Sequence, residues 1–164
     1  MKENILGIDP GLNGGFILLS PEGELIRKDE VPKFDSKNID LMAMRELFFT
    51  YSNTTKHVYM EKITAMPFNG RQGLFKFGKV CGQLEAFITA FQMPVTYVSP
   101  NKWMKKMHDG ISKEIDSKKR SAIACKQLFP TLDMRRNEKC KKPHDGYLDG
   151  LLLAEYGRRE VYGN

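Results

Sequence analysis

The chain has 164 residues, of which 41% are hydrophobic and 28% charged, and its formal net charge is +6. This balance is typical of a globular protein with a packed core and excludes a disordered chain. No apolar run is long enough to cross a membrane, and the opening residues lack the pattern of a signal peptide. The three cysteines are an odd number without zinc-like pair spacing, which favours reduced thiols and a cytoplasmic location.

The predicted elements begin with strands and end with helices. Apolar and β-branched runs bounded by turn residues predict five strands, over residues 5–9, 16–19, 25–31, 57–61 and 94–98. Helical spacing of apolar residues and capping signals predict five helices, over 39–51, 72–92, a short segment opening at Ser99-Pro100, 117–129 and 144–159. No repeat or linker divides the chain, so we predict a single domain over residues 1–164.

The order of these elements indicates the fold class. Three consecutive strands favour an antiparallel meander, whereas later strands separated by helices favour parallel addition to the same sheet. We therefore predict an α/β fold in which helices flank a five-stranded mixed sheet.

The long helix over 72–92 is apolar on two sides. Its narrow apolar seam is widened by Phe75 and Phe87, while Gly78 and Gly82 lie four residues apart and allow another backbone to approach. This pattern favours a helix that packs on the sheet and also contacts a second copy of the chain in a homodimer. A deeply buried helix in a monomer would show the same pattern.

Four carboxylates occupy positions that suit a shared site. Asp9 ends the first strand before a glycine-rich turn, and Glu61 ends the fourth strand. Asp145 and Asp149 are four residues apart, so they lie one above the other on one face of the last helix. Asp9 and Asp145 have ordinary explanations, because Asp-Pro-Gly makes a turn and an aspartate caps a helix, whereas Asp149 inside the first turns is harder to explain in this way. Together they are better explained by a cation.

The ligand type indicates the metal. Clustered carboxylates without buried cations would have raised pKa values unless hard divalent ions bind them. Oxygen-only ligands suit Mg²⁺, with Mn²⁺ as an alternative. Two such ions in one site can promote in-line hydrolysis of a phosphodiester.

At these residues the sequence resembles the RuvC-type Holliday junction resolvases of the RNase H-like superfamily. The likeness is carried by Gly7-Ile8-Asp9-Pro10-Gly11, by Glu61 and by the acidic helix at residues 144–157. It is especially similar to the branch of phage and chloroplast resolvases. Further matching segments are Gly70-Arg71-Gln72-Gly73, Ser112-Lys113, Asp116-Ser117-Lys118-Lys119, Leu128-Phe129-Pro130 and Asp149-Gly150-Leu151.

The resemblance implies an RNase H-like nuclease domain. It also implies a homodimer that cuts four-way DNA junctions by paired nicks in recombination, repair or phage DNA processing, in a bacterial or phage-infected cell. Carried over, Asp9, Glu61, Asp145 and Asp149 would be catalytic and hold two Mg²⁺ ions. One departure concerns Asp145. RuvC itself spaces its last two acids three apart, and chloroplast-type relatives have histidine here, so Asp145 is either a ligand or a proton carrier.

The expected DNA-binding surface is basic. Residues 102–142 contain 13 basic and five acidic side chains, a net charge of +8 that exceeds the charge of the whole chain. Such a surface suits sequence-independent phosphate contacts. Phe68 resembles an aromatic residue that some relatives place beside junction bases, and simple packing under its loop is the alternative. The expected contacts are Phe68, Arg71, Lys76, Lys79, Lys102, Lys113, Lys118, Lys119, Arg120, Lys141 and Lys142.

Two other functions fit parts of this pattern. A nuclease of the same superfamily that acts on RNA–DNA hybrids, flaps or other branched DNA would have the same acids. A junction-binding protein without catalysis is the second alternative, and the four acids argue against it. Trp103 is expected to pack in the core rather than stack on a base.

Overall fold

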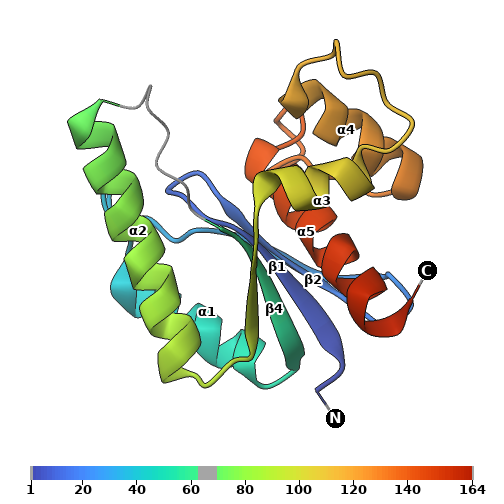
Figure 1. The fold of residues 1–164 in the computed structure, drawn as a ribbon. Helices are drawn as coiled ribbons and strands as arrows, with labels where there is room; N and C mark the ends of the chain where they lie inside the picture. The colour runs from blue at the N-terminus through green and yellow to red at the C-terminus, as the bar shows by residue number, and fades with distance from the viewer. Residues whose placement is uncertain (1, 63–69, 164) are drawn as a thin grey trace.

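The computed structural model describes residues 2–62 and 70–163. Its five strands form one sheet in the order β3-β2-β1-β4-β5 (Figure 1). They are β1 (Asn4–Asp9), β2 (Gly15–Leu19), β3 (Leu25–Glu30), β4 (Thr55–Glu61) and β5 (Val95–Val98). β2 is antiparallel to both β1 and β3, while β4 is parallel to β1 and β5 is parallel to β4. The predicted five-stranded mixed sheet is confirmed.

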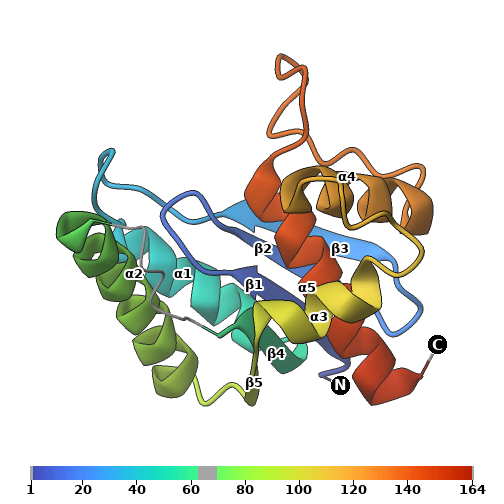
Figure 2. The same ribbon diagram turned by 45° about the horizontal axis from the view of Figure 1, so that its top comes forward.

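Helices cover both faces of this sheet (Figures 1 and 2). One face is covered by α1 (Leu41–Ser52) and α2 (Arg71–Ala90), and the other by α3 (Pro100–Met107), α4 (Ser117–Leu128) and α5 (Asp145–Tyr162). The observed helices lie within three residues of the predicted ends. Among the described helices, none combines the length and apolar character that a membrane crossing requires.

Alternation along β1 assigns its side chains to the two layers. Leu6 and Ile8 are fully buried against α1 and α2, whereas Ile5 is fully buried in the cluster formed with α5. Because successive side chains of a strand point to opposite faces, Gly7 and Asp9 lie on the α5 face with Ile5. The strand therefore delivers its terminal carboxylate to the same layer as the last helix.

Helix α5 lies unusually close to β1 because glycines face each other at the contact. A Cβ atom added to Gly7 would lie 2.1 Å from the Gly150 carbonyl oxygen, and one added to Gly15 would lie 2.7 Å from that of Gly146. These distances are shorter than any side chain allows, so only glycine backbone fits. Bare backbone contact thus fixes the depth at which α5 meets the sheet.

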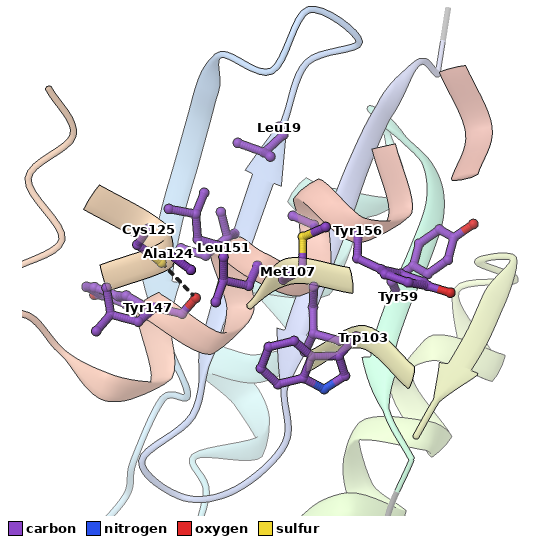
Figure 3. Packing of buried hydrophobic residues seen from close by; sticks show 14 of the residues in the cluster. Leu19, Tyr59, Trp103, Met107, Ala124, Cys125, Tyr147, Leu151 and Tyr156 are labelled. Atoms are coloured by element: carbon purple, nitrogen blue, oxygen red, sulfur yellow. Dashed lines mark hydrogen bonds between the residues drawn. The ribbon is translucent and has the colours of Figure 1, made fainter. Parts of the chain in front are cut away.

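Helices α3 and α4 complete the α5 layer (Figure 3). Trp103 of α3 is fully buried, and Cys125 of α4 is buried where its thiol donates a hydrogen bond to the Leu148 carbonyl oxygen at 3.4 Å. Tyr156 of α5 packs against Tyr59 of β4 with ring centroids 6.1 Å apart. The Cys125–Leu148 hydrogen bond ties α4 to the first turn of α5, whereas Lys106 of α3 pairs with Glu160 in the last turns of that helix.

Candidate active site

The carboxyl ends of β1 and β4 bring Asp9 and Glu61 together. The parallel register pairs Ile8 with Met60, so the next position sets Asp9 beside Glu61. Neighbouring strands are about 4.8 Å apart. Met60 is fully buried on the α1 and α2 side, which leaves Glu61 on the α5 side with Asp9.

The start of α5 adds the other two acids at the same end of the sheet (Figure 1). Asp145 opens the helix and is exposed, whereas Asp149, one turn later, is half-buried. Gly146, between them, pairs as an isolated β-bridge with Gly14 in the turn that follows Asp9. That bridge and the Gly7–Gly150 contact hold the first turns of α5, which carry Asp145 and Asp149, against the end of β1.

The other three acids lie close enough to Asp9 to affect its pKa. Asp9 keeps part of its surface open, but protein surrounds it closely, and this burial is the main cause that raises the pKa of its carboxyl group well above the usual value. Asp149, Glu61 and Asp145 raise the Asp9 pKa further by charge repulsion, in that order, and Lys118 lowers it. The four predicted carboxylates therefore converge in the fold.

Burial also raises the pKa of Glu61 and of Asp149, and each is opposed by one hydrogen bond. The indole N–H of Trp103 donates to Glu61 at 2.8 Å, which lowers the Glu61 pKa. The Ser121 hydroxyl does the same for Asp149. Donors from α3 and α4 thus orient the carboxylates of β4 and α5.

Asp145 has a different partner. The Lys118 ammonium lies 2.8 Å from its carboxylate, and both side chains are mostly exposed. Within residues 2–62 and 70–163, no three histidine, cysteine, aspartate or glutamate side chains are already arranged as a metal-ligand set. The described acids are instead held individually by an indole, a hydroxyl and an ammonium group.

Three residues at this site were absent from the predicted set of catalytic residues. Trp103 packs in the core as predicted, and it also donates to Glu61. Ser121 and His108 hydrogen-bond to each other at 3.2 Å behind Asp149. A buried indole needs an acceptor, which is a weak signal that the sequence does contain. No local pattern marks Ser121, because its role depends on how α4 packs.

The predicted DNA contacts within the described residues come from several parts of the fold. Those on α2 lie in its first turns, those on α3 and α4 are on the other side of the acidic end, and two precede α5 (Figures 1 and 2). Lys79 donates to Asn38, and Arg120 is half-buried. Phe68 lies outside the described residues. The exposed basic side chains in this set are Arg71, Lys76, Lys79, Lys102, Lys113, Lys118, Lys119, Lys141 and Lys142.

Solved structures share this architecture. Thermus thermophilus RuvC in complex with a Holliday junction substrate superimposes with a TM-score of 0.67 at 14% identity, over 98% of this chain and 96% of that one. The chain has the RuvC fold. A second structure of Thermus thermophilus RuvC gives a TM-score of 0.63 at 15% identity and the same coverage. This RuvC fold places the sheet within the RNase H-like class, as predicted.

The sequence comparisons give no independent assignment. No protein-family model matches the chain, and no curated protein matches it. The structural similarity therefore supports the RuvC fold. At 14–15% sequence identity it does not by itself establish the activity.

Proposed function

We propose that this chain is a Holliday junction resolvase, a structure-selective endonuclease that cuts four-way DNA junctions by symmetric paired nicks. Its role would lie in DNA recombination and repair or in phage DNA processing, and it would belong to the branch of phage and chloroplast resolvases. The observation that carries the proposal is the convergence of Asp9, Glu61, Asp145 and Asp149 at one end of a RuvC fold.

The donor set fits divalent metal ions. Four carboxylates supply only hard oxygen ligands, and Asp9 is destabilised as an anion by its three acidic neighbours. Lys118 lowers the Asp9 pKa by charge attraction. We infer that Asp9, Glu61, Asp145 and Asp149 hold two Mg²⁺ ions, for which Mn²⁺ would substitute. Bound ions would activate water and stabilise the leaving oxygen of the phosphodiester.

The protein side chains would prepare this chemistry by fixing the acids. Trp103 aims the carboxylate of Glu61, and Ser121 aims that of Asp149. The ammonium of Lys118 beside Asp145 reduces the local negative charge that a DNA phosphate meets on approach. Asp145, as the most exposed acid of the set, is placed either to bind metal or to carry a proton to or from solvent.

A homodimer would supply two such sites for the two nicks. On α2, Phe75 is 74% exposed, and a Cβ atom added to Gly78 or Gly82 would meet nothing within 4 Å. An exposed aromatic ring beside bare backbone is the kind of surface that a second helix covers. The proposal therefore expects the mass of two chains in solution.

Cleavage of branched DNA tests the proposed function. An immobile and a mobile four-way junction are incubated with Mg²⁺ beside duplex, flap and RNA–DNA hybrid controls. We expect paired nicks that yield religatable products. Asp9→Asn should reduce the rate about 10³-fold or more, because several kcal/mol of charge stabilisation are lost, while junction binding persists.

The controls separate the alternatives. Glu22→Gln removes an exposed carboxylate in the turn after β2, away from the acids, and should leave cleavage unchanged. Cutting of hybrid or flap with the junction spared would assign the RuvC fold to another RNase H-like nuclease. Tight junction binding without any cutting would instead indicate a binding protein.

A further inference from the structure

A surface cavity lies between the end of α3 and the start of α4, and none of the four acids lines it. Its volume is about 490 Å³, far more than the roughly 30 Å³ that one water occupies in the liquid. Four of its lining residues are basic in type, namely Lys105, His108, Lys113 and Arg120, and one, Asp109, is acidic. The cavity therefore combines room for a ligand with a positive lining.

Two nitrogen atoms in the lining are buried without a hydrogen-bond partner in the described part of the chain. They are Nδ1 of His108 and Nε of Arg120. His108 is only 5% exposed, and its other ring nitrogen is engaged with Ser121 at 3.2 Å. The Ser121 hydroxyl hydrogen-bonds to Asp149, so Nε2 of His108 donates to Ser121 and Nδ1 is left as an acceptor. Buried polar atoms nearly always have a partner, so the N–H at Arg120 Nε indicates that the cavity receives an acceptor.

The charges of the lining are also uncompensated. Within residues 2–62 and 70–163, Lys105, Lys113 and Arg120 form no ion pair with a carboxylate of the chain. A half-buried guanidinium without an anion is unfavourable, whereas its planar N–H groups match the oxygens of a phosphate. Asp109 is exposed at the edge and leaves a clear positive excess.

We propose that this cavity is a phosphate-binding pocket that seats one non-scissile backbone phosphate of the DNA substrate. Arg120 lies at the floor and supplies the buried donor, and Lys105 and Lys113, which are exposed, form the mouth. The assignment to DNA rests on the proposed nuclease function, while the affinity for a phosphate oxyanion rests on the pocket alone.

The pocket shares a wall with the acidic site. His108 hydrogen-bonds to Ser121, and the Ser121 hydroxyl also hydrogen-bonds to Asp149. On the other side, the His108 ring packs edge-on against Trp103, with centroids 5.6 Å apart, and Trp103 donates to Glu61. A phosphate in the pocket would thus hold the backbone at a fixed offset from the carboxylates, which is how phosphate contacts set register.

The pocket is tested first with inorganic phosphate, followed by amide NMR shifts of the whole chain. We expect saturable shifts confined to residues 104–121 and their neighbours in the wild type. Arg120→Gln and Lys113→Gln should each weaken this binding at least about fivefold. Lys126→Gln, on the same helix but outside the pocket, should leave it unchanged. Lys113 is exposed, so its variant remains informative if the Arg120 substitution fails to fold.

The DNA assignment is tested with a four-way junction at several salt concentrations. Arg120→Gln should lower the slope of log affinity against log salt by about one, and affinity about tenfold at 0.1 M salt. Phosphate binding without these changes would mean that the pocket serves another phosphate compound, and the DNA assignment falls. Scattered or absent phosphate shifts would overturn the pocket itself, whether or not the chain cuts junctions.

Discussion

Helix α5 contains two carboxylates whose pKa values are shifted in opposite directions. Near its carboxyl end, Glu155 is 4% exposed and accepts hydrogen bonds from Arg158 and Arg159, which lower its pKa despite burial. Near its amino end, burial raises the pKa of Asp149, and repulsion from Asp145 raises it further. One helix therefore contains a compensated acid and an uncompensated one, about two turns apart.

The difference separates a structural charge from a functional one. Two arginines neutralise Glu155, and Arg158 also donates to the Pro21 carbonyl oxygen at 3.2 Å, which ties α5 to the turn after β2. The acids around Asp9 receive a hydroxyl, an indole and one exposed lysine, which is too little positive charge for four carboxylates. Stability accounts for the first arrangement, and the proposed divalent cations would account for the second.

Removing the ion pairs of Glu155 should have the largest effect on stability. Glu155→Gln leaves two arginines without their carboxylate, so unfolding free energy should fall by about 3 kcal/mol, or Tm by about 6–12 °C. Cleavage per folded molecule should be retained. Thermal unfolding at pH 7 measures the first quantity, and a junction assay below the melting range measures the second.

A pH series sharpens this result. The folded-state pKa of Glu155 is lowered, so its stabilisation is present above the usual glutamate pKa of about 4.3 and is lost as pH falls through the folded value. The difference in unfolding free energy between wild type and Glu155→Gln should therefore disappear at low pH. Glu160→Gln breaks only an exposed pair with Lys106 and serves as the control. A gap that persists at low pH would contradict the ion-pair explanation.

A change at the acidic end should mainly affect activity. Trp103→Phe keeps an aromatic ring but removes the N–H that orients Glu61, so we expect cleavage and metal affinity to fall about 10–100-fold. Unfolding free energy should fall by only about 1–2 kcal/mol. Met107→Leu, on the same helix without a bond to an acid, controls for packing. Equal losses of activity in both variants would reduce Trp103 to a packing role.

The smallest effect is expected at the exposed lysine. Lys118→Ala should change unfolding free energy by less than about 0.5 kcal/mol, because its pair with Asp145 is mostly solvated. Junction binding should lose about one unit of salt slope if Lys118 contacts a phosphate. Lys119→Ala changes the adjacent exposed lysine and is measured beside Lys118→Ala. An unchanged slope in both variants would remove these lysines from the interface.

The sequence predicted the sheet well because its signals are local. Alternating apolar residues, the turn at Asp9-Pro10-Gly11 and the separation of later strands by helices each constrain only adjacent elements. The position of the acids at element ends was also readable, since Asp9 and Glu61 directly follow apolar runs. Their convergence was an expectation from the carboxyl ends of parallel strands, and the register of β1 with β4 supports it.

The supporting residues were not predictable because they depend on tertiary packing. Gly7 lies in an ordinary strand pattern, and only the depth of α5 explains why no side chain fits there. Ser121 and His108 come from separate elements that meet behind Asp149. The homodimer, the metal ions and the individual DNA contacts stay predictions, as does Phe68, which lies outside the described residues.

The central claim is that the acids around Asp9 are uncompensated until divalent cations bind. The direct measurement is Tm as a function of Mg²⁺ for wild type and Asp9→Asn. Without metal the variant should be the more stable at pH 7, because the raised Asp9 pKa marks an unfavourable ionised state, and this advantage should shrink as pH falls through that pKa. Mg²⁺ should stabilise the wild type by about 1.4 kcal/mol at ten times its dissociation constant, and the variant far less. Equal responses to Mg²⁺, or none in the wild type, would contradict the account.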